Sequence, residues 1–218
     1  QLKKITLIYS GGSDSYTLLN YALSKDFNVD CLTFTYNQKH NKEIDFASSA
    51  CKELNVKHSI IDIGDNSEIF FGNSSLTSLE TKIPHGSYKE ETMQSTIVPN
   101  RNMIFISYAI AYSISNNIQE VWYGAHAGDH FIYPDCRPEF LNAMNVAAGL
   151  CDSAKIKIEA PFISYTKGEI IKIGLDLNLD YSKAWTCYEG KQNPCGKCGS
   201  CVERAEAFSD NNSIDPLI

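Results

Sequence analysis

The segment "LIYSGGSDSYTLL" (7–19) joins an apolar run to a helical pattern through two adjacent glycines and several hydroxyl and carboxylate side chains. In an open α/β sheet, ligands bind at the carboxyl ends of the strands, and Gly11-Gly12 follows the first predicted strand directly. Glycines let a backbone approach an anion closely, and the next helix offers unpaired N–H groups there. The segment predicts a phosphate-binding loop or, alternatively, a turn capped by Ser13 or Asp14.

Short apolar runs alternate with helical patterns along most of the chain. Strands are predicted at 5–9, 29–36, 58–63, 120–124 and 155–161, and helices at 15–25, 43–54, 100–116, 137–150 and 166–177. Parallel strands need helical crossovers, so this order predicts an α/β fold with a doubly wound parallel sheet, similar to a Rossmann fold. Residues 64–96 interrupt the alternation with scattered Gly, Asn, Ser and Thr, which predicts an irregular insertion that covers an active site.

Composition narrows the class of protein. The 218 residues carry a net charge of −7, which disfavours general nucleic-acid binding and favours a small-molecule substrate. No apolar run approaches the roughly 18 residues that a membrane span needs, and the chain begins at Gln1 without a charged and then apolar leader. We therefore expect a soluble, cytoplasmic protein with no membrane partner.

Four of the eight cysteines crowd near the C-terminus, in "CYEGKQNPCGKCGSC". Cys187, Cys195, Cys198 and Cys201 follow the spacing C-x7-C-x2-C-x2-C, which suits a tetrahedral zinc ion. An iron–sulfur cluster is the alternative, but in the ferredoxin pattern the fourth Cys and a Pro come last, so zinc is favoured. Four protein ligands leave no open position, which predicts one structural zinc per chain. We divide the chain into a nucleotide-binding domain at 1–180 and a zinc-binding segment at 181–218.

Two basic residues lie at predicted helix starts. Arg101 in "VPNRN" opens the long helix, where a phosphate could be bound, although an N-capping Asn100 explains part of this pattern. Lys167 lies in the first turn of its helix, where the dipole disfavours a cation unless an anion is close. Both positions predict contacts with pyrophosphate.

Polar clusters follow the strand predicted at 120–124. In "GAHAGDHF", Asp129 could accept the ring N–H groups of a purine-like base, and a metal site with His126 and His130 is a weaker alternative. In "YPDCRPEF", Asp135 could cap the following helix and Arg137 could bind a carboxylate or a base edge. The other interpretation of this second cluster is a capped turn with a surface salt bridge.

The motifs together resemble a known family. Ser10-Gly11-Gly12-Ser13-Asp14-Ser15 is similar to the SGGxDS signature of the PP-loop ATP pyrophosphatases. This loop, "YNQKHNKE" (36–43), "VPNRN" (98–102), "YPDCRPEF" (133–140) and the four-cysteine tail occur in the order found in the 7-cyano-7-deazaguanine synthase family. The resemblance spans nearly the whole chain.

The resemblance implies an ATP-dependent C–N ligase of queuosine biosynthesis. Its expected substrates are 7-carboxy-7-deazaguanine, ammonia and ATP with Mg²⁺, its products 7-cyano-7-deazaguanine and AMP (or ADP-type products if the family chemistry differs), and its expected assembly a homodimer. The residues expected to bind ATP are Tyr9, Ser10, Gly11, Gly12, Ser13, Asp14, Ser15, Arg101 and Lys167. Those expected to act in catalysis are Ser10, Asp14, Ser15, Arg101, Asp129 and Lys167. Those expected to bind the deazaguanine are Asp129, Tyr133, Asp135 and Arg137.

One departure from the family pattern keeps alternatives open. Phe131-Ile132 stands where the family usually carries a small Ser-Gly pair, so an enzyme that stops at the 7-amide is one alternative. A tRNA-thiolating PP-loop enzyme is another, although its basic RNA-binding surface conflicts with the net charge of −7. A non-catalytic nucleotide-binding protein is the third.

Overall fold

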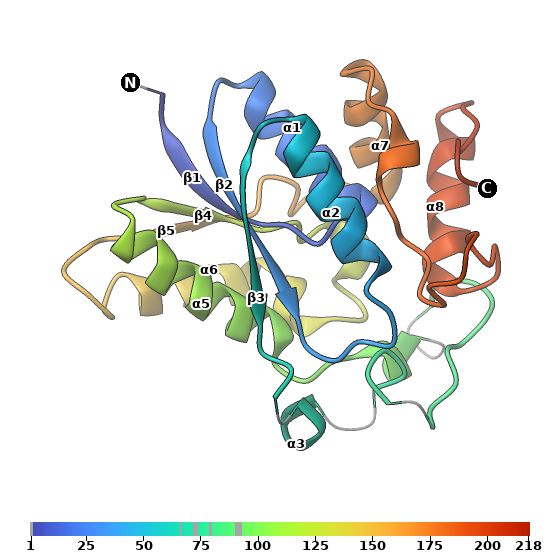
Figure 1. Ribbon diagram of the computed structural model, residues 1–218, viewed down its shortest axis with the longest axis horizontal. Helices are drawn as coiled ribbons and strands as arrows, with labels where there is room; N and C mark the ends of the chain where they lie inside the picture. The colour runs from blue at the N-terminus through green and yellow to red at the C-terminus, as the bar shows by residue number, and fades with distance from the viewer. Residues whose placement is uncertain (1, 66, 72–73, 79, 90–92) are drawn as a thin grey trace.

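A parallel β-sheet forms the centre of the computed structural model, which describes residues 2–65, 67–71, 74–78, 80–89 and 93–218 (Figure 1). In this part of the chain the sheet has five strands in the order β3-β2-β1-β4-β5, and every neighbouring pair is parallel. The strands are β1 (Lys4–Ile8), β2 (Asn28–Thr35), β3 (Lys57–Asp62), β4 (Glu120–Trp122) and β5 (Lys157–Glu159). The chain winds outward from β1 to β3 and then returns to β4 on the other side, so the doubly wound prediction is confirmed.

Helices cover both faces of this sheet (Figure 1). On one side lie α1 (Ser13–Ser24) and α2 (Lys42–Glu53), with α7 (Lys167–Asp176) packed on α1 and α8 (Gly199–Asp210) packed on α7. The other packs against α5 (Arg101–Ser115) and α6 (Pro138–Ala148). Because β2 is covered on both sides, it is buried almost continuously, as strands of parallel α/β sheets usually are. None of the helices in the described ranges is long and apolar enough to cross a membrane.

The predicted elements occur in the predicted order, with shorter strands on one side of the sheet. β4 and β5 have three residues each, whereas the sequence patterns suggested five and seven. After β4 the Tyr123 N–H still donates to the Glu159 carbonyl at 3.1 Å, and residues 123–126 then line a cavity. α7 begins where expected, and the Thr166 hydroxyl and the Glu169 carboxylate each accept a backbone N–H in a capping box.

The predicted insertion at 64–96 is irregular in its described residues. It contains the short α3 (Ser67–Phe71), a 3₁₀ turn at Gln94–Thr96 and an isolated antiparallel bridge between His85 and Cys198. Residues 66, 72–73, 79 and 90–92 lie outside the described part of the chain, so the predicted covering role of the whole insertion stays a prediction.

The C-terminal helix α8 is absent from the sequence predictions. It packs on α7, and its Ala207 and Phe208 belong to the same apolar core as β1 and α1. Arg204 on its inner face is 1% exposed, forms a two-pronged ion pair with Asp215 and donates to the carbonyl of Ala184 at 2.6 Å. These contacts satisfy a charge that would otherwise be costly to bury. The division at residue 180 stays a prediction.

Candidate active site

A cavity opens where the order of the sheet reverses, at the carboxyl ends of β1 and β4. This is the position at which open α/β sheets bind ligands. The cavity is lined by ten of the residues predicted from the sequence, namely Tyr9, Ser10, Gly12, Ser13, Asp14, Ser15, Arg101, Asp129, Tyr133 and Lys167. The predicted residues Gly11, Asp135 and Arg137 are not among its lining.

The loop after β1 is shaped for a ligand rather than for capping a helix. Gly12 occupies the N-cap position of α1, and within the described residues no side chain caps this helix, so capping by Ser13 or Asp14 is wrong. The Ser13 Oγ and Asp14 Oδ1 atoms are buried, and neither has a hydrogen-bond partner among the described residues. Buried polar atoms are normally paired, so these two are suited to a group that binds in the cavity.

Gly11 supports the loop from behind. Its φ is +88°, a conformation that side chains rarely adopt, and a Cβ atom here would lie 2.2 Å from the carbonyl oxygen of Glu43 on α2. The Gly11 carbonyl accepts the N–H of Trp185 at 3.0 Å. Only glycine therefore lets the loop lie this close to α2 and to the segment that precedes the cysteines.

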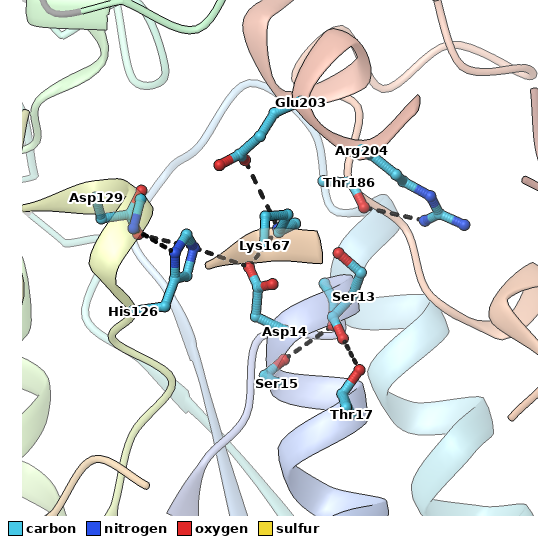
Figure 2. A network of polar contacts seen from close by, with 12 residues as sticks. Ser13, Asp14, Ser15, Thr17, His126, Asp129, Lys167, Thr186, Glu203 and Arg204 are labelled. Carbon is cyan, nitrogen blue, oxygen red and sulfur yellow. Dashed lines mark hydrogen bonds and ion pairs between the residues drawn. The ribbon is translucent and has the colours of Figure 1, made fainter. Parts of the chain in front are cut away.

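Lys167 meets the loop across the cavity (Figure 2). Its Nζ lies 2.5 Å from Asp14 Oδ2 and 3.7 Å from a carboxylate oxygen of Glu203. Burial opposes the charge of Lys167, but Asp14 outweighs it and raises the pKa of the ammonium. Burial also works against the Asp14 carboxylate, and Lys167 and His126 overcome it and hold that pKa below its usual range. The sequence analysis predicted an anion close to Lys167. In the free protein this anion is the Asp14 carboxylate.

His126 and Asp129 extend this polar cluster along the cavity (Figure 2). The His126 Nε2 atom lies 3.3 Å from Asp129 Oδ2 and 3.6 Å from Asp14 Oδ2. Because the Gly128 N–H points to Nδ1 at 3.2 Å, the ring proton is assigned to Nε2, facing the two carboxylates. The hydroxyl of Tyr88 donates to the other oxygen of Asp129 at 2.8 Å.

Three acidic and two basic side chains therefore lie close together in the cavity, namely Asp14, Asp129, Glu203, Lys167 and His126. His126, Asp129 and Glu203 place ligand atoms within 4.8 Å of one another, a grouping that could hold a cation. The weak metal alternative that combined His126, Asp129 and His130 is not the grouping found in the described part of the chain. Glu203 takes the place of His130, and it comes from α8, close to the cysteines.

Arg101, at the start of α5, also lines the cavity. Burial disfavours its charge, but Tyr36, Tyr133 and Asp135 outweigh burial and raise the pKa of the guanidinium. Asn100 occupies the N-cap position with φ +57°, but its side chain makes no capping bond in the described structure, so the expected capping by Asn100 is wrong.

Asp135 and Arg137 do not line the cavity, and each makes a hydrogen bond to a backbone group. The sequence had suggested that Asp135 caps the helix that follows it. Instead, Asp135 accepts the backbone N–H of Asn102 at 3.2 Å and so caps α5. Arg137 is exposed and donates to the carbonyl of His130 at 2.6 Å. Phe131 is 44% exposed and Ile132 is buried, and neither lines the cavity, so the departure from the family pattern lies outside the lining.

Several lining residues escaped the sequence predictions. Glu43, Tyr88, Tyr188 and Glu203 all border the cavity. Burial raises the pKa of Glu43 from an ordinary 4.5 to about 7, with Arg101 opposing the shift. The only available signal was the position of Glu43 inside "YNQKHNKE"; Tyr88 and Glu203 lie in segments without a recognisable motif.

Cys136 borders the cavity but is unsuited to act as a nucleophile. It is 5% exposed, and burial first, then Asp129 and Asp135, raise the pKa of its thiol, so the reactive thiolate is disfavoured. The thiol packs beside the Asn102 amide at 3.4 Å.

The four C-terminal cysteines form a compact set, here called the knuckle (Cys187, Cys195, Cys198 and Cys201). Their sulfur atoms lie within 4.8 Å of one another, so the set can hold a metal ion. Backbone N–H groups of Glu189 and Cys195 point to the Cys187 sulfur at 3.4 and 3.3 Å, and the Cys198 N–H points to the Cys195 sulfur at 3.2 Å. Such donors suit thiolates that bind a metal.

Comparisons with solved structures agree with this fold. The NMN synthetase from Francisella tularensis superposes with a TM-score of 0.54 at 14% identity, covering 97% of this chain and 78% of that one. A predicted subunit of tRNA methyltransferase from Methanocaldococcus jannaschii gives 0.51 at 13% identity, covering 98% and 90%. At these identities the likeness concerns the fold alone.

Comparisons of sequence are more specific. The family model described as "Queuosine biosynthesis protein QueC" matches residues 4–212. The 7-cyano-7-deazaguanine synthase 2 of Colwellia psychrerythraea is 51% identical over 216 residues, which are 99% of this chain and 98% of the relative. The 7-cyano-7-deazaguanine synthase of Pseudoalteromonas atlantica is 50% identical over the same shares. The predicted resemblance is confirmed, and the chain belongs to the family of queuosine biosynthesis protein QueC.

Proposed function

We propose that this protein is an ATP-dependent C–N ligase that converts 7-carboxy-7-deazaguanine and ammonia to 7-cyano-7-deazaguanine and releases AMP. Two relatives that are half identical to it over nearly their whole length carry the name of that synthase. The observation that carries the proposal is the loop after β1, whose buried Ser13 Oγ and Asp14 Oδ1 have no partner among the described residues. A triphosphate with its cation would provide those partners.

The proposed chemistry follows from the poor leaving ability of a carboxylate oxygen. The substrate carboxylate attacks the α-phosphate of ATP, and an acyl-adenylate and pyrophosphate form. Ammonia displaces AMP and yields the amide. The amide oxygen attacks the α-phosphate of a second ATP and releases a second pyrophosphate, and loss of the second AMP together with the two amide N–H protons yields the nitrile. Each oxygen of the carboxylate thus leaves on one AMP.

The loop after β1 and the side chains of Arg101 and Lys167 would bind the nucleotide. Backbone N–H groups at the start of α1, with the hydroxyls of Ser10, Ser13 and Ser15, would donate to phosphate oxygens. Arg101 and Lys167 both line the cavity, where they would offset the charge that gathers on the departing pyrophosphate. Lys167 would exchange part of its contact with Asp14 for a phosphate oxygen.

The residues around Lys167 also fit Mg²⁺. The free Oδ1 of Asp14 and the carboxylates of Asp129 and Glu203 are oxygen donors, which this cation prefers. When bound, Mg²⁺ neutralises phosphate charge. The protein's own contribution is to hold the Asp14 pKa low through Lys167 and to fix the orientation of the Asp129 carboxylate through His126 and Tyr88.

The deazaguanine would lie between Arg101 and Asp129. Tyr133 borders this space and shares a hydrogen bond of 2.6 Å with the Thr96 hydroxyl, which fixes its ring. Asp135 and Arg137 enter the proposal as supporting residues, because Asp135 holds the first turn of α5 and so places Arg101. Glu43, whose pKa is about 7, is suited to exchange protons when ammonia is consumed near neutral pH.

The proposal includes one structural zinc ion per chain in the knuckle, a cytoplasmic location and a homodimeric assembly. Metal analysis tests the first point. About one zinc per chain is expected, and iron with acid-labile sulfide would contradict it.

One assay tests the function. The protein is incubated with ATP, Mg²⁺, ammonium and 7-carboxy-7-deazaguanine, and AMP and the product mass are measured. We expect AMP and the nitrile. The amide as final product would support the alternative that Phe131-Ile132 suggested, and absence of AMP would contradict the proposal. Thiolation of tRNA would indicate the other PP-loop class.

A further inference from the structure

The segment at 80–89, here called the tether, lies between the knuckle and the cavity. On the knuckle side, His85 and Cys198 form an antiparallel bridge, and the Gly86 N–H donates to the Lys197 carbonyl at 2.8 Å. His85 Nε2 also pairs with a carboxylate oxygen of Glu189 at 2.6 Å. In Figure 1 this green segment runs close below the base of α8. The tether is therefore attached to the loops that carry the metal ligands.

The other end of the tether reaches the cavity. Tyr88 lines it, and its hydroxyl donates to Asp129 Oδ1 at 2.8 Å. Its ring lies close to α8, since a Cβ atom at Gly199 would be 3.1 Å from it and 2.5 Å from the methyl group of Met93. Met93 is fully buried. Gly199 stands between two metal ligands, so the knuckle itself provides the space in which this tyrosine packs.

Tyr88 acts on the cavity through Asp129. One oxygen of that carboxylate accepts from Tyr88 and the other faces His126, so both oxygens have fixed donors. Without the hydroxyl, Asp129 could turn away from the position that it holds beside His126 and Glu203. The path from the knuckle to the cavity is therefore short. It consists of the Gly86–Lys197 hydrogen bond, one residue between Gly86 and Tyr88, and the hydrogen bond from Tyr88 to Asp129.

We propose that the knuckle positions Tyr88 through the tether, so that metal binding fixes the orientation of Asp129 in the cavity. In this account the metal orders the active site and does not only fold the C-terminal segment. Tyr88 is a positioning residue, and the Gly86–Lys197 bond is the link on which it depends.

Hydrogen exchange tests the link without relying on any reaction. The full chain is compared before and after a chelator removes the metal. We expect the Gly86 amide to exchange at least tenfold faster without metal, whereas the Tyr9 amide, which donates to the Leu32 carbonyl within the sheet, keeps its rate. Equal exchange of Gly86 in both states would overturn the proposal.

A double-mutant cycle tests the consequence for the cavity. Tyr88→Phe removes only the hydroxyl, and Gly86→Pro removes the N–H at a residue whose φ of +111° proline cannot adopt. We expect each variant to keep its metal and to lose about tenfold in kcat/KM, through the KM for the deazaguanine. The double variant should be no worse than the worse single one, while additive losses would contradict the link.

Controls separate positioning from damage. Tyr108→Phe changes an exposed hydroxyl on α5 and should leave both constants within twofold. If Gly86→Pro does not fold, Gly199→Ala replaces it, since the added methyl group displaces Met93 and Tyr88 while all four cysteines stay. The kinetic arm rests on the proposed function and the exchange arm does not, so failure of either is distinguishable.

Discussion

The two walls of the cavity are built in different ways. The wall at Tyr9 to Ser15 is one continuous loop, in which the buried Ser13 Oγ and Asp14 Oδ1 atoms have no partner among the residues that the structure describes. The facing wall brings Tyr88, Asp129 and Glu203 together from three distant segments, and the side chains there bind one another. The first wall leaves two buried polar atoms free for a ligand, whereas the second is assembled from side chains that lie close to one another.

This difference indicates that the two walls have different roles when ligands bind. A contiguous loop with free groups gains its partners when ATP binds, so changes in it should affect the nucleotide. The assembled wall has its internal contacts already in the ligand-free structure, and one of its members, Glu203, comes from α8. Variants on each wall can therefore break or sharpen the distinction.

The largest effect on activity is expected for Asp14→Asn. Asp14 belongs to the loop and also contacts Lys167 and His126, so it connects the two walls. The change removes the charge that Lys167 contacts at 2.5 Å and a carboxylate suited to Mg²⁺. We expect AMP formation to fall about a thousandfold, on the order of 4 kcal/mol. Asp176→Asn is the matched control, because Asp176 pairs with Lys172 on the exposed side of α7. A loss of less than tenfold for Asp14→Asn would rule out its joining role.

Glu203→Gln tests the assembled wall. The substitution keeps the shape of the side chain and removes a charge that lies 3.7 Å from Lys167. We expect about a thirtyfold lower kcat with unchanged metal content, measured by AMP release and metal analysis. Glu206→Gln, on the exposed side of the same helix, is the control. Equal activities of the two variants would show that α8 supplies no functional group.

Ser13→Ala tests the free loop. Because the buried hydroxyl has no protein partner in the described structure, its removal should not lower the free energy of unfolding. The KM for ATP should nevertheless rise about tenfold, since one phosphate donor is lost. Ser24→Ala, at the exposed end of α1, controls for the change of residue type. Lower stability with normal ATP kinetics would be the opposite of this prediction.

The last prediction concerns stability and its pH dependence, not catalysis, at Glu43, behind the loop. Burial raises the pKa of Glu43 from 4.5 to about 7, so the folded protein holds a proton that the unfolded chain releases between these values. The contribution of this group to stability is therefore complete below pH 4.5 and is lost as pH rises through about 7. Relative to the wild type, Glu43→Gln should gain about 3 kcal/mol in free energy of unfolding between pH 4.5 and pH 8. Urea unfolding at both pH values measures this, and parallel pH curves would contradict it.

The sequence predicted the features that are local in the chain and missed those that are assembled from distant segments. The alternation of strands and helices, the loop at Ser10–Ser15 and the four cysteines are local patterns, so their residues could be identified directly. The partner of Lys167 is Asp14, which is far away in the chain, and only the folded sheet brings them together. Their pairing carries no sequence pattern.

The errors have physical causes too. α8 was missed because its inner face includes Arg204, whose charge is satisfied only after Asp215 and two carbonyls fold around it. Asp135 was expected to face a ligand, but the start of α5 offers it an N–H at 3.2 Å. Tertiary partners of this kind decide which polar residues remain free for a ligand, and a motif does not reveal them.

The central claim is that the loop activates both oxygens of one carboxylate by adenylation. The most direct measurement uses 7-carboxy-7-deazaguanine labelled with ¹⁸O in both carboxylate oxygens and determines the mass of the AMP released. The account predicts two AMP for each nitrile, each carrying one ¹⁸O atom. Unlabelled AMP, or ADP as the product, would contradict it.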